Sequence, residues 1–156
     1  MFLSGDKIIE FISDYIDKSK QVQPNGVDLT LEEIYTFQTL GFLAKNSREI
    51  PEYKKIPGTV FNLRPGAYVI RYKEWIKIPL NAIGIVLPRS SLLRMGATIY
   101  SALWDSGYEG RGVGLLSVFN PHGIKIEKGA RIAQIFFISA RSSGEYKGIW
   151  KGEGKS

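Results

Sequence analysis

Residues 83–96 read Ile83-Gly84-Ile85-Val86-Leu87-Pro88-Arg89-Ser90-Ser91-Leu92-Leu93-Arg94-Met95-Gly96. The first five form an unbroken apolar run, which is typical of a short buried β-strand. Pro88 then indicates a turn, and Ser91–Met95 suit one helical turn. Apolar strands of this length that stop at a Pro or Gly turn recur along most of the chain.

This pattern predicts a mainly β fold. The chain has 17 Gly and 7 Pro in 156 residues, and they separate short apolar runs. Short strands between such turns indicate a barrel or a jelly roll. The predicted strands are Val27–Leu31, Ala67–Arg71, Trp75–Ile78, Ile83–Leu87, Ala97–Trp104, Val113–Phe119, Ile124–Ile126 and Ile132–Ile138.

The N-terminus carries the one clear helical pattern. We predict a short helix from Ser4 to about Asp17, capped by Ser4, with Ile8, Ile9, Ile12 and Ile16 facing the core. Residues 46–55 have the composition of a polar loop. We expect a single β domain over residues 1–140, followed by a mobile Gly-, Ser- and Lys-rich tail over residues 141–156 that closes over the active site.

Composition excludes several kinds of chemistry. The chain has no cysteine and only one histidine, His122, so disulfides, thiolate catalysis and Cys- or His-based metal centres are excluded. The net charge of +6 is scattered, without a run of five basic residues, and suits a small polyanionic ligand as well as nucleic acid. No apolar stretch reaches the ~18 residues of a membrane span. We expect a cytoplasmic protein.

Two segments offer groups for binding an anion. Arg89, Ser90 and Ser91 follow a buried strand and precede a helical turn, where backbone N–H groups, hydroxyls and a guanidinium can bind a phosphate. An ordinary serine cap beside a surface arginine is the alternative. Arg131 and Gln134 lie on an apolar run, and Gln134 needs a partner if it is buried.

Two carboxylates are candidates for the chemistry. Asp105 and Tyr108 share the turn Asp105-Ser106-Gly107-Tyr108-Glu109-Gly110, where partial burial would tune Asp105 as a base and Tyr108 would offer a flat face. A hairpin turn that merely uses these residue types is the alternative. Asp28 is flanked by apolar residues, and this pattern alone favours the solvated face of a strand over a place in a site.

The order of these segments resembles the family of deoxyuridine triphosphatases (dUTPases) and deoxycytidine triphosphate (dCTP) deaminases. Residues 3–9 resemble the N-terminal helix of the deaminase-like branch. The four motifs of the family then follow in order, at residues 26–29, 88–96, 105–110 and 129–134. The resemblance implies a distorted β-barrel or jelly roll that forms a homotrimer, with dUTP as substrate in three sites between subunits. It also implies Mg²⁺ held mainly by triphosphate oxygens and waters, and neither a stable nucleic-acid partner nor a membrane.

The resemblance further implies a role for each motif position. Asp105 would be catalytic, orienting a water for in-line attack on the α-phosphate and binding the sugar 3′-hydroxyl. Asp28 would hold a magnesium-bound water or orient an arginine, and Tyr108 would stack on the deoxyribose. Backbone groups of Ile99–Leu103 would read uracil. The other expected substrate-binding residues are Arg89, Ser90, Ser91, Arg94, Ser101, Arg131, Gln134, Tyr146, Lys147 and Trp150.

Two departures from the deaminase pattern favour dUTP hydrolysis over deamination. Ser117 stands where deaminases carry a glutamate, and Ala102 and Leu103 replace a polar, basic pair. The chain also lacks the Gly-rich C-terminal arm of well-studied dUTPases. Its residues 146–152 resemble the tail of the deaminase-like branch. This segment is either a frayed basic tail or a cover that places Trp150 or Tyr146 over the base.

Two other functions remain open. The first is a dCTP deaminase that uses another carboxylate, such as Glu109 or Glu127. The second is a non-catalytic β-barrel that binds nucleotides or nucleic acid, suggested by the +6 charge and the 12% aromatic content. Steeply salt-dependent binding without pyrophosphate release would indicate the second.

Overall fold

The computed structural model describes residues 1–155, in which strands predominate. The strands of the main sheet are β2 (Val22–Gln23), β3 (Gly26–Phe37), β6 (Tyr53–Lys55), β8 (Gly66–Tyr72), β10 (Ala82–Pro88), β11 (Ala97–Tyr100), β13 (Val113–Val118) and β15 (Arg131–Ser139). The smaller sheets contain β1 (Ile12–Ser13), β9 (Trp75–Lys77) and β12 (Glu109–Gly110); β7 (Val60–Leu63) and β14 (Ile124–Glu127); and β4 (Phe42–Leu43) and β5 (Arg48–Glu49). The helical segments are α1 (Gly5–Ile8), η1 (Ile9–Phe11), α2 (Lys18–Gln21) and α3 (Ser90–Arg94).

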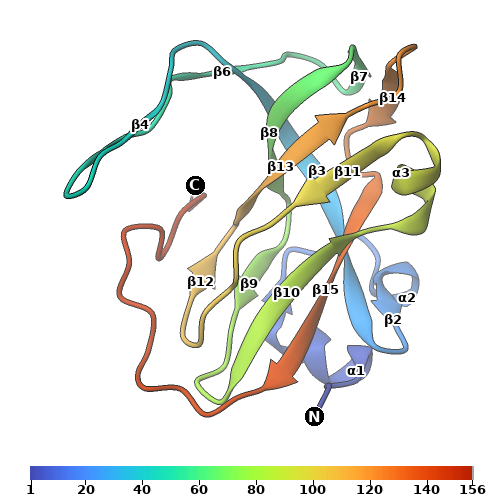
Figure 1. Cartoon of the computed structure of the whole chain (residues 1–156). Helices are drawn as coiled ribbons and strands as arrows, with labels where there is room; N and C mark the ends of the chain where they lie inside the picture. The colour runs from blue at the N-terminus through green and yellow to red at the C-terminus, as the bar shows by residue number, and fades with distance from the viewer. Residues whose placement is uncertain (156) are drawn as a thin grey trace.

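The main sheet has the strand order β10-β15-β3-β8-β13-β11, with β2 and β6 attached to β3 (Figure 1). All of its pairings are antiparallel. Its two ends approach each other, because Gly84 of β10 bridges to Trp104 in the segment after β11. The sheet therefore curls into a nearly closed barrel, which confirms the predicted all-β class.

The core is formed by the inward face of each strand. In β13, Leu116 and Val118 are buried whereas Val113 and Leu115 are exposed, as expected for alternation with a period of two. Burying one such leucine stabilises the fold by about 1.5–3 kcal/mol before entropy is counted. The alternation also leaves apolar side chains on the outer face of the sheet.

The predicted N-terminal helix is shorter than expected. The helical turns of α1 and η1 end at Phe11, and Ile12 then pairs with Ile76 of β9. Asp14 adopts a left-handed φ of 58°, which breaks any continuation of the helix. Ile8, Ile9 and Ile12 are buried as predicted, but Ile16 is 53% exposed.

Two further boundaries differ from the prediction. The predicted strand Ala97–Trp104 ends at Tyr100, because Trp104 turns inward to pair with Gly84. The predicted polar loop over residues 46–55 contains β5 and β6, and β4 pairs with β5 in a hairpin that projects from the barrel (Figure 1). This hairpin forms through backbone hydrogen bonds, and polar side chains do not prevent such pairing.

The tail after β15 runs beside β12, toward the projecting hairpin (Figure 1). Residues 140–155 contain turns but no strand or helix. Within residues 1–155, the helices are too short and too polar to cross a membrane.

Candidate functional site

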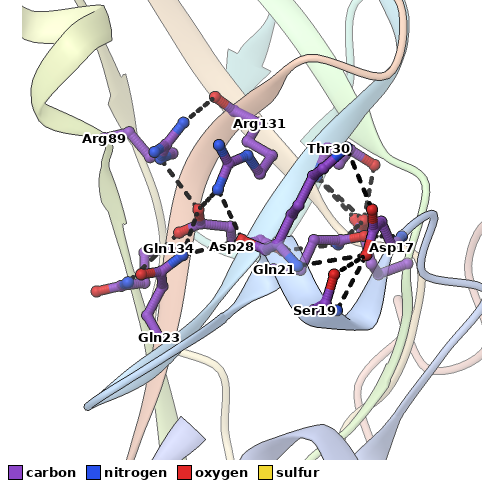
Figure 2. Close-up of polar contacts among 11 residues, drawn as sticks. Asp17, Ser19, Gln21, Gln23, Asp28, Thr30, Arg89, Arg131 and Gln134 are labelled. Carbon is purple, nitrogen blue, oxygen red and sulfur yellow. Dashed lines mark hydrogen bonds and ion pairs between the residues drawn. The ribbon is translucent and has the colours of Figure 1, made fainter.

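A buried carboxylate, Asp28, lies between two arginines (Figure 2). Its side chain is 1% exposed, and its Oδ2 atom lies 3.1 Å from both Arg89 Nε and Arg131 Nη1. The prediction of a solvated strand face for Asp28 is therefore wrong. The strand is covered on both sides at this point, so the alternation of apolar neighbours did not reveal which way the carboxylate points.

Three strands bring this group together. In the sheet register, Asp28 of β3 lies opposite Gln134 of β15, and Gln134 lies opposite Leu87 of β10. Arg89 follows the end of β10, where its backbone N–H donates to the Ile132 carbonyl over 3.0 Å. The Gln134 amide donates a long hydrogen bond of 3.4 Å to Asp28 Oδ1. We call Asp28, Arg89, Arg131 and Gln134 the Asp28 cluster.

The charges of the Asp28 cluster are unevenly exposed. Burial raises the pKa of the Asp28 carboxyl, while the charges of Arg89 and Arg131 act in the opposite direction. The side chains of Arg89 and Arg131 remain 29% and 34% exposed. The buried carboxylate thus holds two guanidinium groups that stay partly exposed to solvent. This arrangement suits the binding of a polyanion.

Sequence reasoning missed the groups that support the cluster. The Gln23 amide donates to Asp28 Oδ2 over 3.2 Å, and Arg131 Nη1 donates to the Lys20 carbonyl over 2.6 Å. In the sequence Gln23 directly precedes the turn residues Pro24-Asn25-Gly26, which give no sign of a place in a site. The pairing of β2 with β3 across that turn is the signal that could have placed it beside Asp28.

A second buried carboxylate, Glu74, lies beneath the same strand. It is fully buried and accepts hydrogen bonds from the backbone N–H and hydroxyl of Thr30 and from the Gln21 amide. The Gln21 amide also donates to the backbone carbonyl of Asp28 over 2.9 Å. Burial raises the pKa of Glu74, and the hydrogen bonds offset part of that rise. Nothing in the sequence around Glu74 distinguished it from a residue in a solvated turn.

Asp105 lies at a different place, on the rim of a cavity of about 280 Å³. The walls of this cavity come from the segment before Asp105, the segment after Tyr108, the tail and the base of the projecting hairpin. The lining includes Ala102, Leu103, Trp104, Tyr108, Gly112 and Val113. Asp105 itself is exposed, so the expected partial burial of this carboxylate is wrong.

Tyr108 is more enclosed than the sequence suggested. It is 7% exposed and packs edge-on against Trp104 and Tyr146, with ring centroids 5.0 and 5.6 Å apart. Its hydroxyl donates to Glu153 Oε1 over 2.6 Å. Only the part of the ring that faces the cavity is open to a ligand.

The tail is attached to this region at two points. The backbone N–H of Tyr146 donates to the Ser106 carbonyl over 2.7 Å. Further along, Gly152 N–H donates to the Glu109 carbonyl over 2.6 Å, and Arg111 N–H donates to the Glu153 carbonyl over 2.9 Å. Trp150, 43% exposed, lines the cavity between these two attachments. Lys147 lies with Asp105 on the wall of a second, neighbouring cavity.

The remaining predicted site residues divide between the two places. Ser90, Ser91 and Arg94 are exposed on α3, directly after Arg89. Ser101 is partly buried and lies beside the cavity, where its hydroxyl accepts a hydrogen bond from Trp104 Nε1. Trp104 and Glu153 were not predicted as site residues.

The two groups of residues do not meet within one chain. Asp105 follows Trp104, which pairs with Gly84 in the first half of β10, whereas Arg89 lies beyond its far end. Arg89 is five residue steps beyond Gly84 along the extended chain, or roughly 16 Å away. Among residues 1–155, no group of three or more His, Cys, Asp or Glu side chains could hold a metal ion.

Comparison with known proteins decides the family. Residues 2–140 match the family model described as dCTP deaminase-like. The chain belongs to the dCTP deaminase-like family. The match covers both the Asp28 cluster and Asp105 and leaves out the tail.

Curated relatives agree with this assignment. The chain is 42% identical over 160 residues to the probable deoxyuridine 5′-triphosphate nucleotidohydrolase of Aeropyrum pernix, covering 99% of each chain. It is 44% identical over 142 residues to the deoxyuridine 5′-triphosphate nucleotidohydrolase of Methanocaldococcus jannaschii, covering 86% of this chain and 90% of the relative.

Solved structures share the fold of this dCTP deaminase-like chain. The 2′-deoxycytidine 5′-triphosphate deaminase of Agrobacterium tumefaciens superposes with a TM-score of 0.67 at 18% identity, over 87% of this chain and 47% of that one. The native dUTPase of EIAV superposes with a TM-score of 0.52 at 19% identity, over 84% and 86% of the two chains.

Proposed function

We propose that this protein is a dUTP diphosphatase, a hydrolase that converts dUTP to dUMP and pyrophosphate by attack of water on the α-phosphate. Such an enzyme removes dUTP and supplies the precursor of dTTP. The observation that carries the proposal is the pair of guanidinium groups held by the buried Asp28, in a chain whose relatives are named for dUTP hydrolysis over nearly their full length.

The phosphates of dUTP bind to the Asp28 cluster and α3. Arg89 and Arg131 offer charge-assisted hydrogen bonds, and Gln134, Ser90, Ser91 and Arg94 complete the set. Because Asp28 already fixes the two guanidinium groups, they lose little freedom when the ligand binds. The same groups stabilise the charge that develops as pyrophosphate leaves.

Asp105 orients the attacking water and binds the 3′-hydroxyl of the sugar. Its exposed side chain stands on the rim of the cavity, where its oxygens can accept hydrogen bonds from the water and hold it in line with the α-phosphate. The cavity receives the nucleoside, with the deoxyribose against the open part of Tyr108 and the uracil beside backbone groups near Ser101.

Magnesium accompanies the triphosphate and neutralises its charge. Asp28 Oδ2 is already engaged by Arg89, Arg131 and Gln23, whereas within the described part of the chain Oδ1 receives only the long bond from Gln134. Oδ1 therefore retains the capacity to accept a hydrogen bond from a metal-bound water. This donor set fits an ion held mainly by the substrate and not by a protein cage.

The active enzyme is a homotrimer whose sites lie between subunits. Two features support this part of the proposal. Asp105 and the Asp28 cluster stand at opposite ends of β10 in one chain, so a second subunit has to complete each site. The outer faces of β11 and β13 also expose large apolar side chains, among them Tyr100 at 55% and Leu115 at 39%, which lie opposite each other in the register.

The tail moves over the bound nucleotide. Tyr146 and Trp150 supply aromatic surface above the base, and Lys147 reaches a phosphate. The two backbone attachments of the tail, at Tyr146 and at Gly152, leave the residues between them free to adjust to the ligand. We place the enzyme in the cytoplasm.

Deamination of dCTP is the second candidate. It needs a carboxylate at the base, and Ser117 lies on β13 at the position where a glutamate was expected. Glu109 accepts a hydrogen bond from Trp75, Glu127 lies on β14, and neither residue lines the cavity. Glu153 does line the cavity, and burial raises its pKa, so dCTP has to be tested as a substrate.

The decisive assay incubates the purified protein with Mg²⁺ and either dUTP or dCTP and separates the nucleotide products by chromatography. We expect dUMP from dUTP and unchanged dCTP, with the activity abolished in Asp105→Asn. Asp6→Asn is the matched control, because among residues 1–155 the exposed Asp6 carboxylate makes no ion pair or hydrogen bond with the Asp28 cluster and does not line the Asp105 cavity. Uridine nucleotides formed from dCTP would mean deamination, and no turnover of either would overturn the proposal.

A further inference from the structure

The indole ring of Trp104 connects the two segments that border the Asp105 cavity. Its Nε1–H donates to Ser101 Oγ over 3.0 Å, and the Ser101 hydroxyl donates in turn to the Ala102 carbonyl over 2.8 Å. On the opposite side, a Cβ atom placed on Gly112 would lie 2.4 Å from Cη2 of the indole. The ring therefore spans the distance between the outgoing segment at Ser101 and the returning segment at Gly112.

The indole cannot easily move from this position. Trp104 is 6% exposed, and its backbone exchanges hydrogen bonds of 2.9 and 3.1 Å with Gly84 of β10. The rings of Tyr72 and Tyr108 pack against it, with centroids 6.3 and 5.0 Å away. A side chain held by packing on several sides resists displacement, because protein interiors are close-packed.

We propose that Trp104, fixed by Ser101, sets the width of the part of the cavity that receives the pyrimidine and thereby selects dUTP against dTTP. This inference rests on the proposed function. Trp104 is a positioning residue. The backbone near Ser101 binds the base, and Ala102, Leu103 and Val113 limit the space around it. The indole keeps the segment at Ala102 and Leu103 at a fixed distance from the segment at Val113.

The physical argument concerns one methyl group. Uracil and thymine present the same hydrogen-bonding edge and differ by a 5-methyl group. A site can reject such an added group only if its walls do not yield, and a methylene-sized difference is worth about 10–200-fold at best. A rigid spacer between the two segments supplies the resistance that exposed loop backbone would otherwise lack.

Two variants loosen the spacer to different degrees. Trp104→Phe keeps an aromatic ring but is smaller and lacks the N–H, whereas Ser101→Ala keeps the indole and removes only its acceptor. Trp75→Phe is the matched control, because it removes an indole N–H bond of 2.9 Å to Glu109 outside the lining of the cavity. Thermal unfolding followed by circular dichroism establishes that each variant is folded.

The readout is the ratio of dissociation constants for dUMP and dTMP, measured by calorimetry on the intact protein, together with kcat/KM for dUTP and dTTP. We expect Trp104→Phe to reduce the preference for the uracil nucleotide by about tenfold, Ser101→Ala to reduce it less, and Trp75→Phe to leave it unchanged. If Trp104→Phe does not fold, Ser101→Ala alone decides.

The outcomes separate this inference from the function on which it rests. Wild-type protein that hydrolyses dUTP, with both folded variants keeping the wild-type preference, overturns the role of Trp104 alone. A general loss of affinity for both nucleotides at an unchanged ratio also overturns it, because that is what a purely structural role would give. Wild-type protein that neither binds dUMP nor hydrolyses dUTP overturns both.

Discussion

Arg89 Nε and Arg131 Nη1 lie at the same distance, 3.1 Å, from a single oxygen of the buried Asp28. Two like charges are thus held near each other by one carboxylate that solvent hardly reaches. Without it, their repulsion would spread the guanidinium groups apart and lower the local density of positive charge. Asp28 therefore acts as the structural centre of the proposed phosphate site.

Asp28→Asn tests this arrangement. The amide keeps the shape of the carboxylate but not its charge. We therefore expect KM for dUTP to rise and kcat/KM to fall by roughly 10–100-fold, the size of effect typical when a side chain that orients a binding group is removed. Stability should fall by about 1–2 kcal/mol, less than for a fully buried pair because both arginines are about one-third exposed. Steady-state kinetics and urea unfolding measure the two effects. Unchanged KM would show that Asp28 does not position the arginines.

Mixing two inactive variants tests the shared site. If Asp105 acts with the Asp28 cluster of a neighbouring subunit, Asp105→Asn and Arg89→Ala chains form some intact sites when they are co-refolded. Statistical trimers from equal amounts contain about a quarter of the wild-type number of intact sites, so about a quarter of wild-type activity should return. Activity that stays at the level of the separate variants would mean that each site is built from one chain.

The tail should respond to pH through Glu153. Burial raises the pKa of Glu153 above its ordinary value of 4.5, while the bond from Tyr108 and the charge of Arg71 act in the opposite direction. Because the docked tail binds the proton more readily than the free tail, this contribution to docking is complete below the ordinary pKa and is lost as the pH rises through the raised one. Acidification should therefore tighten docking.

The Nε1–H signal of Trp150 in NMR spectra reports this docking. We expect it to shift toward its docked position as the pH falls toward the ordinary pKa of 4.5, and to lose this dependence in Glu153→Gln, which mimics the protonated carboxyl. Glu145→Gln, which alters an exposed carboxylate of the same tail, is the control and should behave like the wild type. An identical titration in Glu153→Gln would exclude Glu153 as the titrating group.

The hydroxyl of Tyr72 should be dispensable for stability. It is a buried side-chain oxygen without a hydrogen-bond partner among residues 1–155, and burial raises its pKa. Removing an unsatisfied hydroxyl avoids its desolvation cost, so Tyr72→Phe should raise the free energy of unfolding by about 1 kcal/mol. Tyr68→Phe is the control and should lower it by a similar amount, about 1 kcal/mol, because it loses a bond of 2.8 Å to the Arg64 carbonyl. A destabilised Tyr72→Phe would indicate that the hydroxyl has a partner in the assembled protein.

Most strands could be predicted because their apolar pattern is local. Ile83–Leu87 and Ile132–Ile138 lie within β10 and β15. Turn residues bound both segments and so restrict where each strand can begin and end. The N-terminal helix was overestimated because Ile12 also suits a strand, and its pairing with Ile76 depends on a segment far along the chain. A local periodic pattern carries no information about a strand partner that lies far along the chain.

The candidate site shows the same division. The residues of the Asp28 cluster were found through the motifs, but the burial of Asp28 depends on which strands flank β3. Glu74 gave no signal at all, since its partners Gln21 and Thr30 come from a different part of the chain. Trp104 looked like an ordinary apolar residue at a strand end, and only the close approach of Gly112 reveals its place between two segments.

Hydrolysis of dUTP in water enriched in ¹⁸O tests whether water attacks the α-phosphate. We expect dUMP as the product and the heavy oxygen in its phosphate, because water attacks the α-phosphorus and pyrophosphate leaves. Mass spectrometry of both products after a single turnover resolves the position of the label. Label in pyrophosphate, or dUTP left intact while dCTP is converted, would contradict it.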